Sequence, residues 1–396
     1  RIVRTGPDGQ PRYATETITS VDPSTGGVRV LLGGPRFTKD SQNIISTGMA
    51  TNPGSTFKGV VLAALFDRGF VPDDVIDGTS PCTVRPDDPN YIDPTRPTAG
   101  VGPQTAHNYA GEGGSVGTIR TQTLESSNCG FVRLGQVVGL RNVIDMAKAL
   151  GFRNPVWNSP DTTGQPPHAM NPYFSQEAFG GGFEVSALDM AGAYATFAND
   201  GVHNEVYLVD RIEDSSGHVI WSHKLNPKRA LSTQAARLIT QVLTENVQGG
   251  TGTGARLPSG QPAAGKTGTS DGPNDLWFAG YTPQLATAVW IGSTSDPFVV
   301  YPGGTGGAYA AVSWRAFMSS ALEDRPRADF APAEPTRSGI TLHLGPEDGM
   351  TFADRYGARR PTTTRPAPAT TDASPGSSRE STSGTTPTSP TSGPST

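Results

Sequence analysis

A serine and a lysine three positions apart could form a nucleophile and its base. Ser55 and Lys58 stand in the pattern S-x-x-K at the start of an apolar run that predicts a buried helix. Because residues i and i+3 share a helix face, the Lys58 amine can reach the Ser55 hydroxyl. A lysine accepts a proton near neutral pH only when burial or a nearby cation lowers its pKa from about 10.4. A second lysine in the site would supply that cation and activate the serine.

Two later segments could complete such a site. Residues 126–128 give S-x-N, and residues 266–269 give K-T-G-T ahead of a strand-like run that starts at Leu276. The order S-x-x-K, S-x-N, K-T-G along a chain is typical of serine enzymes that penicillin acylates. Two serines, two lysines, an asparagine and threonines, with no histidine or metal, suit acyl transfer from an anionic peptide.

Three other patterns match motifs but lack the context that their chemistry needs. Residues 260–267 match a phosphate-binding loop, and residues 249–255 contain a dinucleotide-binding variant, yet neither follows a strand and opens a helix. Ser115 lies in G-x-S-x-G without a preceding strand, so we interpret it as a loop residue. The six histidines show no metal-binding spacing. We expect no nucleotide, cofactor or metal.

Composition limits the class of protein. The 396 residues carry a formal net charge of −5 without long basic runs, which excludes the usual nucleic-acid-binding proteins. The longest apolar run, GVVLAALF, has eight residues, too few to span a bilayer. The chain begins without methionine and enters a strand-like pattern almost at once, so we expect a soluble fragment of a longer, anchored protein.

Periodicity predicts the elements that must position these segments. Strands are expected as a hairpin over residues 16–33 and as a pair over residues 276–292. Helices separate them in the sequence, which predicts an α/β fold with an antiparallel sheet. Residues 71–117, rich in Pro, Gly, Asp and Thr, are expected to be irregular. The predicted helices run from residue 55 to a stop at Gly69, over residues 130–138, 141–150, 186–199 and 233–247, and near residues 309–322.

The chain divides by composition into three parts. Residues 1–330 form the expected domain, and residues 331–360 are an uncertain extension. Residues 361–396 contain no Leu, Ile, Val, Phe, Tyr or Trp, so they cannot bury enough apolar surface to fold and are expected to be disordered. Two cysteines, Cys82 and Cys129, fit no zinc or redox spacing and could be buried thiols or one disulfide.

Beyond the three motifs, the sequence resembles the transpeptidase domain of class A, bifunctional penicillin-binding proteins. The resemblance covers roughly residues 17–322 and includes NPGSTFKG around the first motif and GGFEVSALDMAGAYATFANDG near the middle of the chain. It implies the penicilloyl-serine transferase fold, with a central antiparallel sheet flanked by helices and an all-helical subdomain. The segment before Ser55 departs from the family, because it lacks the Asn-Arg-Ala run and the Arg-Gln-Pro-Gly that many relatives carry.

The resemblance implies roles for the first two motifs. Ser55 would attack the penultimate D-Ala carbonyl of a peptidoglycan stem peptide while Lys58 takes its proton. Ser126 would relay a proton to the departing D-Ala amine, and Asn128 would hydrogen-bond the substrate backbone.

The third motif is implied to bind the substrate carboxylate. Lys266 would tune the electrostatics and help to hold that carboxylate, to which Thr267 and Thr269 would offer hydroxyls. Gly268 is expected in a strand, where its missing side chain lets the substrate lie alongside. The backbone N–H groups of Ser55 and Thr269 would form the oxyanion hole.

The implied function is a D,D-transpeptidase that crosslinks stem peptides and is acylated by β-lactams. It would act on the extracytoplasmic face of the bacterial membrane with other wall-synthesis proteins, without nucleic acid or nucleotide. A D,D-carboxypeptidase, which passes the same acyl group to water, and a non-enzymatic penicillin sensor are the alternatives. A β-lactamase would also need a deacylating base, at Glu177 or Glu184.

Overall fold

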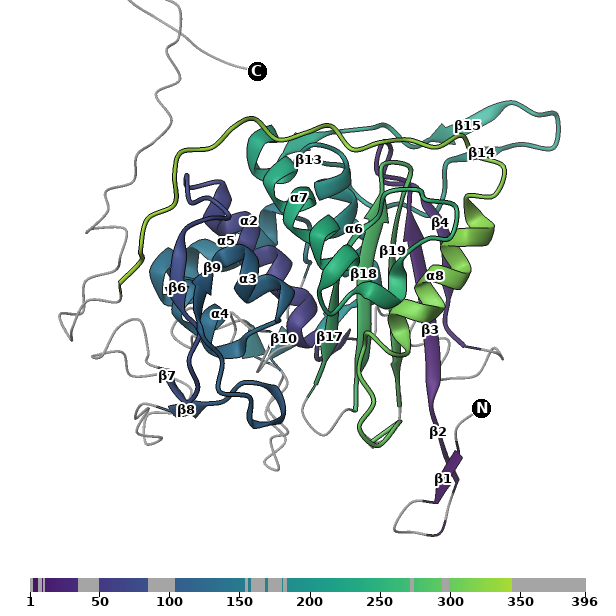
Figure 1. Cartoon of the computed structure of the whole chain (residues 1–396). Coiled ribbons are helices and arrows are strands. Elements are labelled where there is room, and N and C mark those ends of the chain that lie inside the picture. The colour runs from purple at the N-terminus through teal and green to yellow at the C-terminus, as the bar shows by residue number, and fades with distance from the viewer. Residues whose placement is uncertain are drawn as a thin grey trace, which may run out of the picture. The chain divides into compact units, whose positions relative to one another are not determined.

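A five-stranded antiparallel sheet lies at the centre of the structure (Figure 1), in the strand order β17-β18-β19-β3-β4. The hairpin of β3 and β4 thus pairs with the hairpin of β18 and β19, which is far from it in the sequence. The pairing runs between β3 and β19, where Val289 lies opposite Ile18. This arrangement confirms the predicted α/β fold with an antiparallel sheet. The strands are β17 (Ala264–Thr269), β18 (Leu276–Thr282), β19 (Leu285–Gly292), β3 (Thr15–Val21) and β4 (Val28–Leu32).

The computed structural model describes residues 3–5, 9, 11–34, 50–84, 104–153, 156–157, 168–169, 180, 184–270, 274–293 and 299–343. All of them belong to one compact unit, Arg1–Arg360. The expectations for Glu177, for most of the segment before Ser55, for residues 344–360 and for the tail over residues 361–396 lie outside the described residues.

Helices cover both faces of the sheet, which explains why β18 and β19 are buried along their whole length. Trp277 and Tyr281 of β18 face an apolar core with α6 and α7, whereas Phe278 faces a second core with α8. Alternation along a strand places neighbouring residues on opposite faces. The helices are α6 (Ala187–Ala198), α7 (Thr233–Gly249) and α8 (Ala310–Ala321).

A helical part lies beside the sheet and is built around α2, in which every residue is buried. Its helix α4 begins two residues before the predicted start, because the Ser127 hydroxyl accepts a hydrogen bond from the Gly130 backbone N–H as an N-cap. The helices are α2 (Lys58–Phe66), α3 (Ile119–Leu124), α4 (Asn128–Val138) and α5 (Leu140–Ala149).

The stretch that was expected to be irregular contributes two short antiparallel ladders to this helical part. Each has three residue pairs, and the first accepts Thr341 as a further bridge at Val75. Strands this short show no reliable alternation in a sequence, so the prediction of irregular structure was wrong for them. They are β6 (Val75–Asp77) with β9 (Val116–Thr118), and β7 (Cys82–Val84) with β8 (Gln104–Ala106).

Residues 325–343 cross the molecule as an extended strap from the end of α8 to β6 (Figure 1). Gln261 and Gln234 hydrogen-bond the backbone of the strap along the way. At its far end, Arg337 makes a two-pronged ion pair with Asp74, at 2.8 and 2.7 Å. The strap therefore joins the sheet to the helical part.

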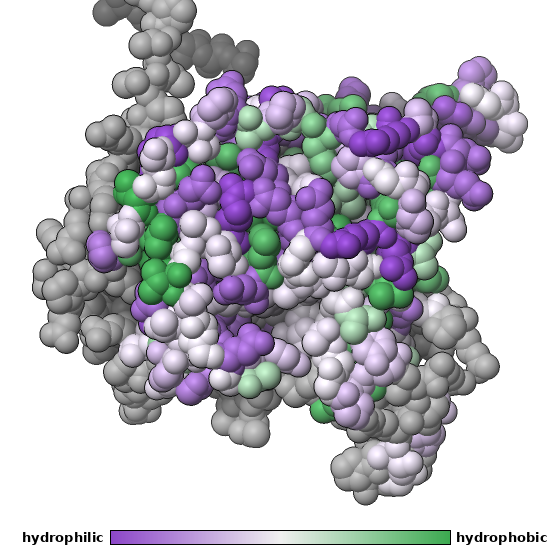
Figure 2. All heavy atoms as spheres, in the orientation of Figure 1, coloured by the Kyte–Doolittle hydropathy of each residue, from purple (hydrophilic) through white to green (hydrophobic). Residues whose placement is uncertain are grey.

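The remaining elements are short, and three of them are 3-10 helices. On the face shown in Figure 2, hydrophilic residues predominate and hydrophobic residues form small separate groups. No helix among the described residues is both long and apolar enough to cross a membrane. These elements are β1 (Val3–Thr5), β2 (Pro11–Tyr13), β5 (Ala50–Thr51), β10 (Val156–Trp157), β11 (His168–Ala169), β12 (Val185–Ser186), β13 (Val202–His203), β14 (Arg211–Glu213), β15 (Val219–Ser222), β16 (Lys228–Arg229), η1 (Gly54–Phe57), η2 (Tyr109–Gly111) and η4 (Thr253–Ala255).

Candidate active site

Ser55 lies on η1, a single tight turn that leads directly into α2. The turn is fixed from both sides. Asn52 accepts a bond from the Gly54 N–H through its side chain and one from the Trp277 indole through its carbonyl, both at 2.8 Å. The Tyr194 hydroxyl donates to the Thr56 carbonyl, also at 2.8 Å. Ser55 itself is half-buried and lies on a turn whose backbone these bonds hold.

The Ser126 hydroxyl lies between two lysine side chains from opposite parts of the fold. Lys266, from the edge strand β17, donates to Ser126 Oγ at 2.8 Å, and Lys58 Nζ lies 3.4 Å from the same oxygen. Both lysines are fully buried. Ser126 has a positive φ of 57° in the connection between α3 and α4, a conformation that is uncommon for a residue with a side chain. The three motifs therefore meet at one hydroxyl.

The Lys58 ammonium is held mainly by the second motif. It donates to the Ser126 carbonyl at 2.7 Å and to Asn128 Oδ1 at 2.8 Å, and it lies 5.2 Å from the centre of the Phe131 ring. Among the described residues its hydrogen bonds do not include Ser55, whose contact with Lys58 was expected from the helix spacing. The side chain instead extends toward the carbonyl oxygens at the start of α4.

Burial makes both lysines unusually weak bases for their type. Burial, and then the charge of Lys266, hold the pKa of Lys58 well below its usual range. Burial lowers the pKa of Lys266 to about 7. A neutral amine is therefore available near neutral pH. A serine nucleophile needs such an amine to accept its proton.

The third motif forms β17 at the free edge of the sheet, as expected for Gly268. A Cβ on Gly268 would lie 2.5 Å from the Pro53 carbonyl oxygen and 3.0 Å from Trp277 Cβ. The missing side chain thus allows β17 to pack against the nucleophile turn, a contact with protein that the sequence interpretation did not include. Thr269 Oγ1 accepts a bond from the Gly306 N–H at 3.1 Å.

Some residues that support the site carry no motif signal. Thr251 shares a hydrogen bond with the Thr267 hydroxyl at 2.8 Å, and Asn246 donates to the Gly265 carbonyl at 2.8 Å. His107 contributes only its carbonyl, which accepts from Asn128 Nδ2 at 3.0 Å. A sequence does not show which backbone carbonyls will accept hydrogen bonds from the site. For Thr251, the glycine-rich segment around it was the sequence feature that pointed to the site.

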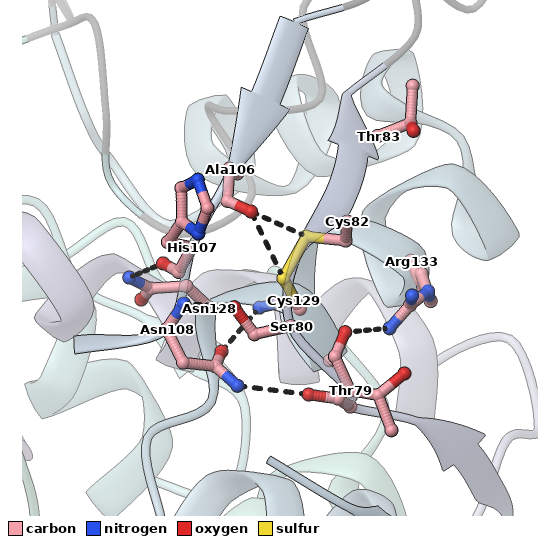
Figure 3. Close-up of a disulfide and its surroundings, with 12 residues drawn as sticks. Thr79, Ser80, Cys82, Thr83, Ala106, His107, Asn108, Asn128, Cys129 and Arg133 are labelled. Atoms are coloured by element: carbon pink, nitrogen blue, oxygen red, sulfur yellow. Dashed lines mark hydrogen bonds between the residues drawn. A yellow bond between two sulfur atoms is a disulfide. The ribbon is translucent and has the colours of Figure 1, made fainter. Parts of the chain in front are cut away.

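Cys82 and Cys129 answer a question that the sequence left open. Cys82 and Cys129 form a disulfide, and Cys129 directly follows Asn128 (Figure 3). This resolves the choice between two buried thiols and one disulfide. Within the described ranges, no three His, Cys, Asp or Glu side chains gather where they could hold a metal ion. Ser115 lies in an exposed loop before β9. It therefore does not stand between a strand and a helix, as the nucleophile of G-x-S-x-G would.

Solved structures share this fold. PonA1 of Mycobacterium tuberculosis, in complex with penicillin V, superposes with a TM-score of 0.66 at 24% identity, covering 86% of each chain. Penicillin-binding protein 1A of Haemophilus influenzae gives a TM-score of 0.64 at 20% identity over 84% of this chain and 52% of that one.

Curated relatives match in sequence as well. Penicillin-binding protein 1A of Neisseria lactamica is 29% identical over 78% of this chain, and that of Mycolicibacterium smegmatis is 30% identical over 84%. The chain spans only 36% and 40% of the lengths of these two relatives. A family model described as the penicillin-binding protein transpeptidase domain matches residues 17–297. The chain therefore belongs to the penicillin-binding protein transpeptidase domain family.

Proposed function

We propose that this chain is a D,D-transpeptidase that crosslinks peptidoglycan stem peptides through an acyl-enzyme on Ser55 and is acylated there by β-lactams. The observation that carries the proposal is the Ser126 hydroxyl, which lies 2.8 Å from the buried amine of Lys266 and 3.4 Å from that of Lys58. A serine turn beside two lysines with lowered pKa values suits acyl transfer without histidine or metal. Family membership supports the same reaction.

In the first step, the Ser55 hydroxyl oxygen attacks the carbonyl carbon of the penultimate D-Ala, and neutral Lys58 takes the hydroxyl proton. The oxyanion that forms accepts hydrogen bonds from the backbone N–H groups of Ser55 and Thr269. Their proximity is supported by Gly54, on which a Cβ would lie 3.0 Å from the Thr269 nitrogen.

In the second step, the bond between the carbonyl carbon and the D-Ala nitrogen breaks, and the leaving amine needs a proton. Ser126 bridges the two lysines, so it can pass a proton from Lys58 to that amine while Lys266 donates to its oxygen. The Ser55 ester then reacts with the amine of a second stem peptide, which restores the serine hydroxyl and forms the crosslink.

The substrate carboxylate is assigned to the third motif. Lys266 in its charged form attracts the anion, and Thr267 and Thr269 offer hydroxyl donors beside it. Asn128 bonds Lys58 and offers its amide to the substrate backbone.

The nucleophile is tested by intact-mass measurement after addition of a β-lactam, in the native chain and in Ser55→Ala. We expect one stable adduct on the native chain and none on the variant. An adduct that persists in Ser55→Ala would refute the assignment of Ser55, and rapid loss of the native adduct over hours would indicate a β-lactamase.

The fate of the acyl group is tested with a donor stem peptide, with and without an acceptor amine. A transpeptidase gives a crosslinked product only when the acceptor is present. Release of D-Ala with no crosslink in either case would indicate a D,D-carboxypeptidase, and no turnover of an acylated protein would indicate a sensor.

We also propose that the domain acts on the extracytoplasmic face of the bacterial membrane, in contact with other wall-synthesis proteins. The disulfide Cys82–Cys129 supports an oxidising compartment, where such bonds form and persist. Titration of the denatured, unreduced protein should find no free thiol, because both cysteines are paired. Two titratable thiols in protein isolated from its native compartment would contradict this location.

A further inference from the structure

The hairpin formed by β7 and β8 lies beside the start of α4, which carries Asn128 of the second motif (Figure 3). We propose that this hairpin, anchored by a disulfide and by the buried side chain of Asn108, is a positioning element that orients Asn128 for acylation. The proposal rests on the function proposed above, because it concerns the same reaction.

The disulfide joins the hairpin to the residue next to Asn128. Cys82 begins β7, and Cys129 lies in the first turn of α4, with the two Cα atoms 5.5 Å apart. Both side chains are buried, with 4% and 0% of their surface exposed. A covalent bond at this point limits how far the hairpin can move from the start of α4.

The hairpin reaches the active site through one carbonyl. His107 directly follows β8, and its carbonyl accepts a hydrogen bond from Asn128 Nδ2 at 3.0 Å (Figure 3). The other end of the same amide, Oδ1, accepts from Lys58 Nζ at 2.8 Å. Because an asparagine amide has donors at one end and an acceptor at the other, the His107 carbonyl determines which end meets the lysine.

Asn108 fixes the chain at the residue after that carbonyl. Its Oδ1 accepts from the Cys129 N–H at 3.0 Å and from the Ser127 hydroxyl at 3.3 Å, and its Nδ2 donates to the Gly78 carbonyl at 3.0 Å. The side chain is 6% exposed, so each of these bonds replaces one to water. Asn108 thus ties the hairpin to the residues on either side of Asn128.

Among the described residues, further contacts hold the segments that flank the hairpin. Arg133 of α4 donates to the Asp77 and Thr79 carbonyls at 2.7 and 2.9 Å, and Ser80 Oγ accepts from the Asn108 N–H at 3.2 Å. The hairpin's apolar contacts with α4 form a small cluster of three buried residues, Cys82, Cys129 and Val132, with Ala106 beside them. Gln136 donates to the Thr83 carbonyl at 3.4 Å. A two-stranded ladder is marginally stable by itself. The disulfide and Asn108 are the contacts that link the hairpin to the neighbours of Asn128, so the position of the His107 carbonyl relative to Asn128 depends on them most directly.

The test compares Cys82→Ala/Cys129→Ala and Asn108→Ala with the native chain in the rate of acylation by a β-lactam across a range of pH. Each variant should acylate about 10- to 100-fold more slowly, because small displacements of a catalytic group are costly. Loss of the Asn128 oxygen from Lys58 removes a bond that favours the ammonium form. The rise of the rate with pH should therefore move to lower pH. The charged group that acts on Lys58, Lys266, is unaltered in these variants.

Thr105→Ala is the matched control, since Thr105 lies on the same hairpin with an exposed side chain. It should acylate like the native chain. An unchanged rate and pH profile in folded variants would overturn the proposal. A rate that falls only in proportion to the unfolded fraction, with no shift of the pH profile, would overturn it as well. Asn108→Ala keeps the disulfide and decides the case if the double variant does not fold. A native chain that is not acylated at all would contradict the proposed function instead.

Discussion

Lys58 and Lys266 are buried side by side, and among the described residues no carboxylate pairs with either of them. A buried lysine without a counter-ion is stabilised in its neutral form, which is the form that can accept a proton. The two amines also repel each other when both are charged, so they titrate as a pair. The chemistry thus follows from what surrounds the lysines more than from the lysines themselves.

The repulsion gives a prediction for Lys266→Met, which keeps most of the side-chain volume and removes the charge. Because the charge of Lys266 lowers the pKa of Lys58, that pKa should rise in the variant. A higher pKa means that a higher pH is needed to deprotonate the base. The rise of the acylation rate with pH should move to higher pH, measured with a β-lactam under conditions where the variant is folded. An unmoved or lowered midpoint would contradict the assignment of Lys58 as the base.

Gly268→Ala tests the contact between β17 and the nucleophile turn. The added Cβ would lie 2.5 Å from the Pro53 carbonyl oxygen, so the turn must shift. We expect a loss of about 1–3 kcal/mol in the free energy of unfolding and slower acylation of Ser55. The control is Gly249→Ala at the end of α7, where a Cβ meets nothing within 4 Å. Equal behaviour of the two variants in urea unfolding and acylation would show that the contact is unimportant.

At the scale of elements, the strap over residues 325–343 runs from the end of α8 to β6 and connects the sheet to the helical part (Figure 1). Asp74 is fully buried and accepts two bonds from Arg337 and one each from the Val71 and Ile340 N–H groups. Its backbone carbonyl accepts from the N–H of Ile119, the first residue of α3. Asp74 thus joins the strap, through its carboxylate, to the helix that leads to the second motif, through its backbone carbonyl.

Arg337→Ala should lower the free energy of unfolding by about 1–3 kcal/mol, since it leaves Asp74 buried without its cation. Water screens part of the ion pair and limits this loss, because the Arg337 side chain is 42% exposed. Arg327→Ala is the matched control, because the pair Arg327–Asp329 on the same strap is exposed on both sides. It should change stability by less than about 0.5 kcal/mol. Similar losses in the two variants would argue against a special role for Asp74.

The long elements were predictable from the sequence and the short ones were not. The apolar period of α6 and α7 and the paired runs of β18 and β19 extend over enough residues to give a clear pattern. The ladders of β6 and β7 are three residues long, and the strap has no period because its backbone is held by side chains from elsewhere. Local patterns do not contain such long-range contacts.

The active site, too, was predictable only in part. The residue types and order of the three motifs predicted that they meet, and hydrogen bonds do join Lys58 and Lys266 to Ser126 and Lys58 to Asn128. The partner of Lys58 was not predictable, because a lysine can extend to any acceptor within reach and the fold brings Asn128 Oδ1 of the second motif to 2.8 Å from Lys58 Nζ. The contact of Gly268 with Pro53 likewise depends on how β17 packs against a turn more than 200 positions earlier in the sequence.

At the scale of the whole molecule, the buried lysines link stability to pH. Their pKa values are lower in the folded chain than in the unfolded chain, so unfolding takes up protons above pH ~7. The titration of Lys266 should therefore raise the free energy of unfolding between about pH 7 and 9, by up to about 1.4 kcal/mol per pH unit. Urea unfolding at several pH values measures this slope, which should be smaller in Lys266→Met. A slope that is equal in the variant would contradict burial of a titrating Lys266.

The Ser126 hydroxyl meets lysines that are 68 and 140 positions away in the sequence. No local fragment of the chain contains two of the three groups, so none can show partial activity. Covalent labelling by a fluorescent β-lactam would then count correctly assembled molecules one by one. In a mixture of folded and misfolded protein, the labelled fraction would measure the yield of folding, independently of how fast each folded molecule reacts.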